Sequence, residues 1–166
     1  ARSWAIPGTP GLEHRIGGIE KQDGSGNISY EPANHQRMTD FRRNKILNIA
    51  NDIPEQRVEN GEEGGDLAIV GWGSTYGPIS RAVDNKLQEG KKVSHIHLRH
   101  IWPLPRNFGD LLRGFKKVIV PEMNDGQLKT LLRDQYLIDV QPLTKVTGQP
   151  FKIAEIERAI DAALEN

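Results

Sequence analysis

The regular alternation of short apolar segments with amphipathic segments over residues 66–166 constrains the fold of this chain more than any other feature. Short apolar runs are typical of buried strands, and apolar residues repeated at helical spacing are typical of helices packed on a sheet. Strands that alternate with helices become parallel neighbours through right-handed crossovers. The pattern therefore predicts an α/β fold, a three-layer α/β/α sandwich on a mostly parallel sheet. The expected strands are residues 67–70, 92–98, 117–120 and 138–142, and the expected helices are residues 79–88, 108–113, 126–134 and 152–164.

The first part of the chain does not share this alternation. Glycines and prolines interrupt residues 1–33. Within this region, residues 15–22 and 27–30 have the composition of two short strands around a Gly-containing turn. We expect these two strands to form a hairpin.

A helix and a linker are expected next. Asn34 is a plausible N-cap, and a mostly apolar stripe recurs at helical spacing after it. The stripe consists of Met38, Phe41, Lys45, Ile46 and Ile49. Residues 51–65 are acidic and rich in glycine, as linkers often are. We therefore expect a connecting segment over residues 1–65 and an α/β domain over residues 66–166.

The composition excludes several classes of function. The chain has 22 basic and 22 acidic residues, so its net charge gives no reason to expect nucleic acid or a membrane as partner. No apolar run approaches the roughly 20 residues that span a bilayer. Cysteine is absent, which excludes disulfides, thiolate catalysis and cysteine-ligated clusters within this chain. Because the sequence starts at Ala1 without a secretion signal, we expect a piece of a longer cytoplasmic protein.

The glycine-rich turn at residues 71–77 invites a phosphate-binding interpretation, because glycines let a backbone approach a pyrophosphate. Its spacing has one residue more than the dinucleotide fingerprint, and no acidic residue stands at the expected ribose position. Arg99 could meet a 2′-phosphate, which leaves an NADP site open. The alternative, which we favour, is a tight turn in which Ser74 or Thr75 caps the next helix, with Pro78 in its first turn.

His95 and His97 are spaced to point to the same side of one strand. Two histidines can begin a metal site, but no third ligand is evident in the sequence. Packing beneath a helix or at a subunit interface is the commoner role for such a pair, and we expect no bound metal.

Glu122 and Asn124 follow the expected strand 117–120 and precede a helix. The carboxyl end of a buried strand is where open α/β sheets place ligand and interface contacts. A carboxylate there can orient a cofactor or accept a hydrogen bond across an interface. Alternatively, Asn124 or Asp125 caps the helix that begins near Gly126. Both roles can hold together.

Two pairs in the first part of the chain contain histidine. Glu13 precedes His14, and Asn34 precedes His35. A carboxylate beside a histidine can exchange protons with a substrate. Nothing in the sequence brings the pairs together, and the alternative is that they are exposed loop and cap residues.

Five segments resemble, in order, the α subunit of 2-oxoacid:ferredoxin oxidoreductases, especially the branch that acts on 2-oxoglutarate. They are residues 11–14 (GLEH), 34–38 (NHQRM) with Arg42, Arg43 and Lys45 after it, 66–74 (DLAIVGWGS), 102–105 (WPLP) and 121–128 (PEMNDGQL). The resemblance covers essentially the whole chain. It implies a domain like the C-terminal domain of transketolase, with a mixed sheet of about five strands, one of them antiparallel. The expected hairpin is our candidate for that strand.

The resemblance also implies a reaction for the complete enzyme, the oxidative decarboxylation of a 2-oxoacid to an acyl-CoA with ferredoxin as electron acceptor. Thiamine diphosphate, magnesium, an iron–sulfur cluster and coenzyme A are expected in that complex. The family places the thiamine motif on the β subunit, and this chain contains neither that motif nor the pyrimidine-binding motif of the preceding α-subunit domain. We therefore expect no bound cofactor, no catalytic residue and no turnover in this chain alone.

We interpret the chain as an assembly and positioning domain that contacts the β subunit and the rest of the α subunit. The residues expected at interfaces are Gly71, Trp72, Ser74, Thr75, Glu122, Asn124, Gly126 and Gln127, with Glu13 and His35 as weaker candidates. Two alternatives stay open. One is an independent NADP- or CoA-binding domain. The other is the same domain of another thiamine enzyme, such as a transketolase or a branched-chain dehydrogenase β chain.

Overall fold

The computed structural model describes residues 5–14, 17–18 and 20–165. Contacts divide the chain into two compact units, Ala1–Leu47 and Asn48–Asn166. We call them the N-terminal unit and the sheet unit. The division falls upstream of residue 66, where we had expected the α/β domain to begin.

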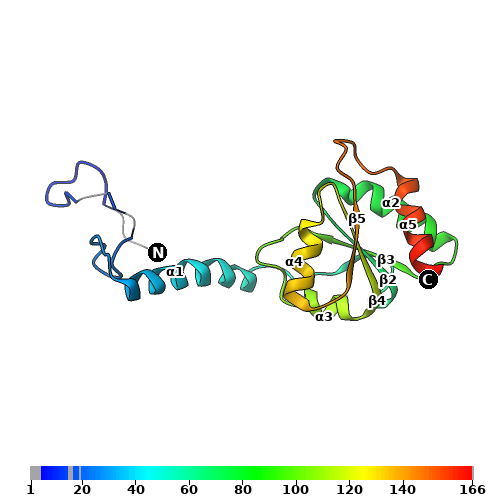
Figure 1. Ribbon diagram of the computed structural model, residues 1–166, viewed down its shortest axis with the longest axis horizontal. Helices are drawn as coiled ribbons and strands as arrows, with labels where there is room; N and C mark the ends of the chain where they lie inside the picture. The colour runs from blue at the N-terminus through cyan, green and yellow to red at the C-terminus, as the bar shows by residue number, and fades with distance from the viewer. Residues whose placement is uncertain (1–4, 15–16, 19, 166) are drawn as a thin grey trace. The chain divides into compact units, whose positions relative to one another are not determined.

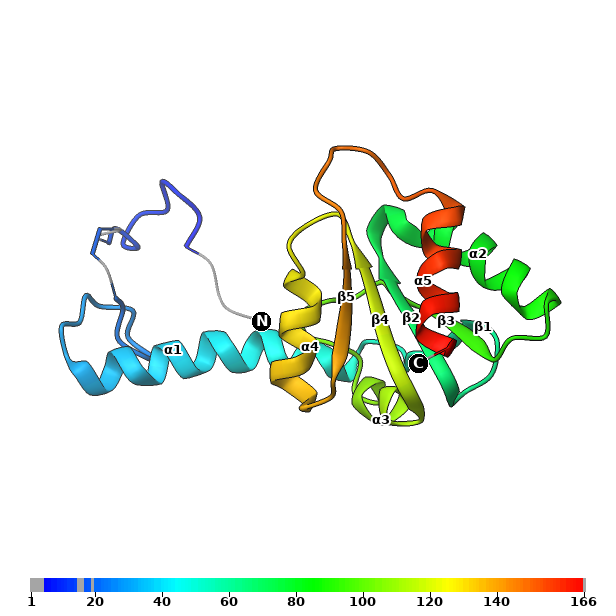
Figure 2. The ribbon, with the colours of Figure 1, turned by 45° about the vertical axis from the view of Figure 1, so that its right-hand side comes forward.

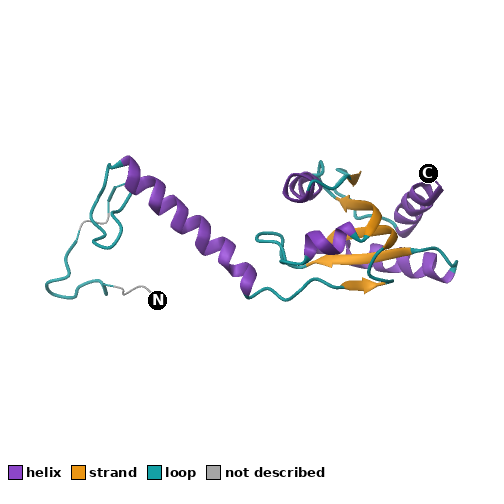
Figure 3. Cartoon of the chain, turned by 90° about the horizontal axis from the view of Figure 1, so that it is seen from below, coloured by secondary structure: helices purple, strands orange, loops and turns teal. Residues whose placement is uncertain are grey.

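The sheet unit is built on one five-stranded sheet with the order β1-β3-β2-β4-β5. Figures 1 and 3 show this sheet with helices beside it. Neighbours β3, β2, β4 and β5 are all parallel, and β1 is antiparallel to β3. The strands are β1 (Val58–Asn60), β2 (Gly65–Trp72), β3 (Val93–Leu98), β4 (Phe115–Glu122) and β5 (Val140–Thr144). This mixed sheet confirms the predicted mostly parallel architecture.

Helices cover both faces of the sheet (Figure 2). Successive residues of β2 point to opposite faces, so Leu67 and Ile69 pack in one apolar cluster and Ala68 and Val70 in the other. The first cluster includes residues of α2 (Tyr76–Gln88) and α5 (Ile153–Glu165), and the second includes residues of α3 (Phe108–Arg113) and α4 (Gln127–Tyr136). The three predicted layers are therefore present.

The antiparallel strand comes from a different part of the chain than we expected. β1 lies within residues 51–65, which we had taken for a linker, and Val58 packs against one apolar cluster of the sheet unit. The expected hairpin strands are reduced to one isolated bridge between Lys21 and Ile28 in the described residues. Arg15, Ile16 and Ile19 of that prediction lie outside them.

The N-terminal unit contains the helix α1 (Pro32–Leu47), which a short 3-10 turn, Asn48–Asn51, follows in the sheet unit. The prediction of Asn34 as N-cap is wrong, because the helix begins at Pro32 and Asn34 lies in its first turn. The amide of Asn34 is buried instead against the preceding loop. It accepts a hydrogen bond from the Asp23 N–H at 3.1 Å and donates one to the Lys21 carbonyl at 2.9 Å.

Candidate functional site

The turn from β4 into α4 is organised around a fully buried carboxylate. Glu122 accepts hydrogen bonds from the backbone N–H groups of Leu128 at 2.8 Å and Lys129 at 3.0 Å. A carboxylate at this position satisfies helix donors that have no partner within the helix, and it also complements the positive end of the helix dipole. Glu122 therefore fixes where α4 starts relative to the end of β4.

Asn124 completes this cap. Its side-chain oxygen accepts from the N–H groups of Gly126 at 2.8 Å and Gln127 at 2.9 Å, and its amide donates to Glu122 at 3.2 Å. Gly126 adopts a left-handed conformation with φ of 90°, which suits glycine. The N-cap residue of α4 is Gly126, so the prediction of Asn124 or Asp125 at that position is wrong, although the Asn124 side chain does bond the first helical N–H group, that of Gln127. Four successive backbone donors at this helix start are already bonded within the chain.

The turn from β2 into α2 is also closed by its own residues. Thr75 is buried, and its hydroxyl accepts from the Trp72 N–H at 3.1 Å and donates to the Trp72 carbonyl at 2.8 Å. Thr75 is the N-cap residue of α2, one of the two predicted, but its side chain makes no capping hydrogen bond and instead closes the 3-10 turn Gly73–Thr75 onto Trp72. The interpretation as a tight turn stands. A Cβ at Gly71 would lie 2.6 Å from the Ile79 side chain, so this turn packs closely on α2.

Large apolar side chains remain exposed at the same edge of the sheet. Because β2, β3 and β4 are parallel, their carboxyl ends meet at one edge. Trp72 ends β2 half-buried, Trp102 follows β3 and is 57% exposed, and Met123 follows β4 and is 40% exposed. Tyr76, at the start of α2, is 41% exposed. At this edge the backbone donors that start α4 are bonded within the chain, the His97 Nδ1 has no partner among the described residues, and aromatic and thioether side chains are exposed. Exposed aromatic and thioether side chains are enriched at interface cores.

His95 and His97 lie on one side of β3, as predicted, with ring centroids 5.8 Å apart. The Tyr76 ring contacts both imidazoles, at 5.2 Å and 4.9 Å. His95 is fully buried, and neither of its ring nitrogens has a hydrogen-bond partner among the described residues. Burial lowers the pKa of His95 to about 4, with a further contribution from His97, and burial also lowers the pKa of His97. Both are therefore neutral at pH 7.

No set of three histidine, cysteine or carboxylate side chains suited to a metal occurs in the part of the chain that the structure describes. Arg99, considered for a 2′-phosphate, is exposed at the end of β3 and lies 3.8 Å from the Glu59 carboxylate. No helix among the described residues is long and apolar enough to cross a membrane.

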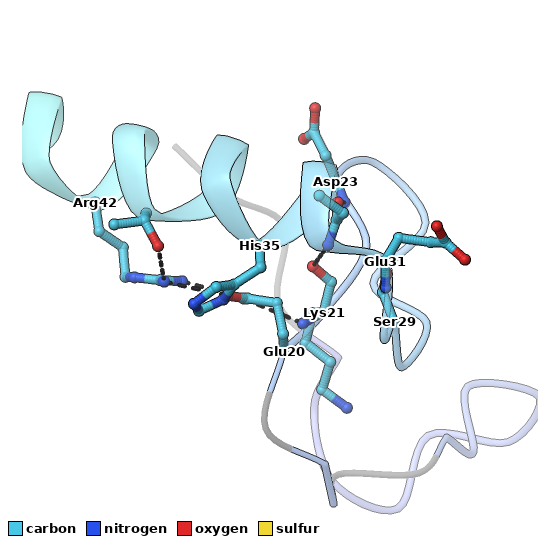
Figure 4. Close-up of polar contacts among 9 residues, drawn as sticks. Glu20, Lys21, Asp23, Ser29, Glu31, His35 and Arg42 are labelled. Carbon is cyan, nitrogen blue, oxygen red and sulfur yellow. Dashed lines mark hydrogen bonds and ion pairs between the residues drawn. The ribbon is translucent and has the colours of Figure 1, made fainter.

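The N-terminal unit holds a second polar cluster, centred on Glu20 (Figure 4). Arg42 donates to both carboxylate oxygens, at 3.1 and 3.2 Å, and the His35 Nδ1 lies 2.8 Å from Oε2. The Arg42 guanidinium and His35 lower the pKa of Glu20 to about 2. The carboxylate that His35 meets is thus Glu20, which lies in an irregular region where no sequence pattern singles it out. Glu13, our candidate, is exposed.

Comparison with known proteins assigns the fold and the family. The family model for the pyruvate:ferredoxin oxidoreductase core domain II matches residues 65–159. A split-gene transketolase shares the fold, with a TM-score of 0.52 and 20% identity over 63% of this chain and 40% of that one. The solved 2-oxoglutarate:ferredoxin oxidoreductase of Magnetococcus marinus matches 96% of this chain and 28% of its own, with a TM-score of 0.85 and 34% identity.

Curated relatives agree with this assignment. The 2-oxoglutarate oxidoreductase subunit KorA of Mycobacterium tuberculosis is 51% identical over 99% of this chain and 25% of its own length. A 2-oxoacid:ferredoxin oxidoreductase α subunit of Aeropyrum pernix is 32% identical over 93% of this chain and 24% of its own. The chain spans about a quarter of the length of these relatives. It belongs to the α subunits of the 2-oxoacid:ferredoxin oxidoreductases and contains their core domain II.

Proposed function

We propose that this chain is the assembly and positioning part of an α subunit in an oxidoreductase that converts 2-oxoglutarate, or a similar 2-oxoacid, to an acyl-CoA. In this proposal thiamine diphosphate, magnesium and an iron–sulfur cluster reside elsewhere in a cytoplasmic complex. The β subunit and the rest of the α subunit are its partners, and ferredoxin accepts the electrons. The relatives named above for 2-oxoglutarate support the choice of substrate.

The observation that carries the proposal is which groups at the carboxyl edge of the sheet are already hydrogen-bonded and which remain exposed. The α4 donors that would hold a phosphate are bonded to Glu122 and Asn124, whereas Trp102 and Met123 remain exposed. A ligand site needs unsatisfied donors, and an interface needs apolar anchors. The edge therefore favours a protein contact over a nucleotide.

Among the residues predicted for an interface, the structure leaves Ser74 and Gln127 exposed and Trp72 and Asn124 half-buried. We propose that these four side chains contact a partner. Thr75 and Glu122 are buried and bonded within the chain, so they shape the edge without touching the partner. Gly71 and Gly126 permit the close turns.

The test uses the complete α and β subunits, purified together, with 2-oxoglutarate-dependent and CoA-dependent reduction of a redox dye as the assay. Trp102→Ser and Met123→Ser should each weaken α–β association at least tenfold, while Leu137→Ser, an exposed apolar residue after α4, should leave it unchanged. The chain of residues 1–166 alone should show no turnover. Turnover by that chain, or a thermal shift of it with NADP or coenzyme A alone, would refute the proposal.

A further inference from the structure

The described residues of the N-terminal unit form no apolar interior of their own. Among its described residues, the buried side chains are two polar ones, Glu20 and Asn34. Every buried apolar side chain in the described part of the molecule belongs to the sheet unit, from Leu67 onward. Fixing a backbone costs roughly 1–2 kcal/mol per residue, which apolar burial normally offsets. The stability of this unit must therefore depend on surfaces outside it.

Apolar side chains of the N-terminal unit face outward instead. The exposed large apolar residues are Ile6, Leu12, Tyr30, Phe41, Ile46 and Leu47. Phe41, Ile46 and Leu47 belong to α1, and Phe41 and Ile46 are part of its predicted apolar stripe, of which Met38 is half-buried. Among the exposed residues of this set, Phe41 lines the hollow described next, whereas Ile46 and Leu47 do not.

One part of this surface is hollowed. A hollow of about 1050 Å³ lies between the loop of residues 21–28 and α1, and Met38, Phe41, Arg42 and Lys45 line it on the helix side. Met38 and Phe41 give it an apolar wall. The described lining carries one carboxylate, that of Asp23, which is 3.9 Å from Arg37.

The charge left in the hollow is positive. The Arg42 guanidinium is neutralised by Glu20 at 3.1 Å, a pair that also holds the loop against α1. Lys45 is exposed and has no ion pair among the described residues. An occupant that matches the hollow therefore carries an apolar side chain next to a carboxylate.

We propose that the hollow receives a segment of the same α-subunit polypeptide from outside residues 1–166, with an apolar side chain against Met38 and Phe41 and a carboxylate toward Lys45. This inference rests on the proposed function. The chain spans 25% of the length of its M. tuberculosis relative, so three quarters of such a polypeptide lies outside it. A segment of the same polypeptide is present at high effective concentration, which favours it over a separate subunit.

The first test is carbodiimide crosslinking of the intact αβ complex, followed by mass spectrometry. The reagent joins a lysine to a carboxylate that it touches. We expect Lys45 to be joined to an Asp or Glu of the α subunit outside residues 1–166. A crosslink from Lys45 to the β subunit or to a second α subunit would overturn the choice of occupant. Absence of any Lys45 crosslink, in a sample whose other lysines react, would overturn the docking itself.

The second test is hydrogen exchange of residues 32–47 in the same complex. Phe41→Ser and Lys45→Glu should each raise exchange there at least tenfold. The matched control for Phe41→Ser is Ile46→Ser, which removes another exposed apolar side chain of the same helix that does not line the hollow. It should stay within twofold of the wild type, and equal effects of Phe41→Ser and Ile46→Ser would overturn the proposal.

Turnover of 2-oxoglutarate by the wild-type complex separates this inference from the proposed function. A complex that turns over without the expected crosslink and exchange pattern refutes the docking alone. A complex that turns over neither 2-oxoglutarate nor any other 2-oxoacid in the presence of coenzyme A refutes the proposed function.

Discussion

At the level of single residues, the buried carboxylate of Glu122 fixes where helix α4 starts. It accepts two backbone N–H groups of α4 and is fully buried. Removing the acceptor leaves buried donors unsatisfied, at about 1–3 kcal/mol. We expect Glu122→Ala to lower the free energy of unfolding of the chain by that amount in urea denaturation. Asp125→Asn, an exposed change in the same turn, should be neutral. Equal stability of the two variants would show that the cap is dispensable.

The buried histidines make stability depend on pH. In the folded chain the pKa of His95 is about 4, below the ordinary 6.5. Between these values the unfolded chain binds a proton that the folded chain does not, so the free energy of unfolding falls as the pH is lowered from 6.5 toward 4. The loss amounts to at most roughly 3 kcal/mol. Denaturation at a series of pH values should show it.

His95→Leu supplies the control for this pH dependence. Removing His95 should reduce the slope of the profile between pH 6.5 and 4, and His97, whose pKa is also lowered by burial, should account for a remaining slope. Glu20 has its folded pKa lowered from 4.5 to about 2, so the stability it contributes is present above 4.5 and lost only as the pH falls from there toward 2. An unchanged slope above pH 4.5 in His95→Leu would assign the effect to other groups.

At the level of single residues, sequence reasoning found what local chemistry determines. The bonds of the Asn124 side chain at the start of α4 could be predicted because they reach residues only two and three positions away, although the N-cap position itself falls on Gly126. Glu20 could not be predicted, because its partners His35 and Arg42 lie 15 and 22 positions away and the loop that brings them together has no periodicity.

At the level of elements, strand β1 depends on a glycine beside it. A Cβ at Gly61 would lie 2.5 Å from the Ser94 hydroxyl and 2.7 Å from the Val93 carbonyl, and its φ is 97°. Gly61→Ala should therefore destabilise the sheet unit by about 1–3 kcal/mol and raise hydrogen exchange in β1. Gly77→Ala, in α2 with no neighbour within 4 Å, should be neutral or stabilising. If both substitutions were tolerated equally, the close packing of β1 on β3 would be in doubt.

The predictable elements are those with a long apolar signal. β2, β3 and β4 and the helices between them are buried on defined faces, so their periodicity is visible in the sequence. β1 has three residues in an acidic, Gly-rich context, and its pairing with β3 is a tertiary contact that no local pattern encodes. Of the expected hairpin, the described residues keep one antiparallel bridge, Lys21 to Ile28, and it does not supply the antiparallel strand of the sheet.

At the level of the whole molecule, the two units should differ in their ability to fold alone. The sheet unit contains both apolar clusters, so residues 48–166 should fold alone in a cooperative thermal transition. Residues 1–47 should show little helix by circular dichroism, because a helix without apolar cover is marginal in water. A stable isolated N-terminal peptide would contradict this view and remove the energetic basis of the docking segment.

The two edge strands of the sheet bear on how this chain avoids edge-to-edge aggregation. Unpaired strand edges are templates that recruit strands from other molecules. Here one edge is the three-residue β1, and the other, β5, carries Pro142, which has no N–H to offer an incoming strand. Short edges and prolines both discourage such pairing. The two edge strands of this sheet therefore offer little to a strand of another molecule, which keeps the sheet from growing by addition of further copies.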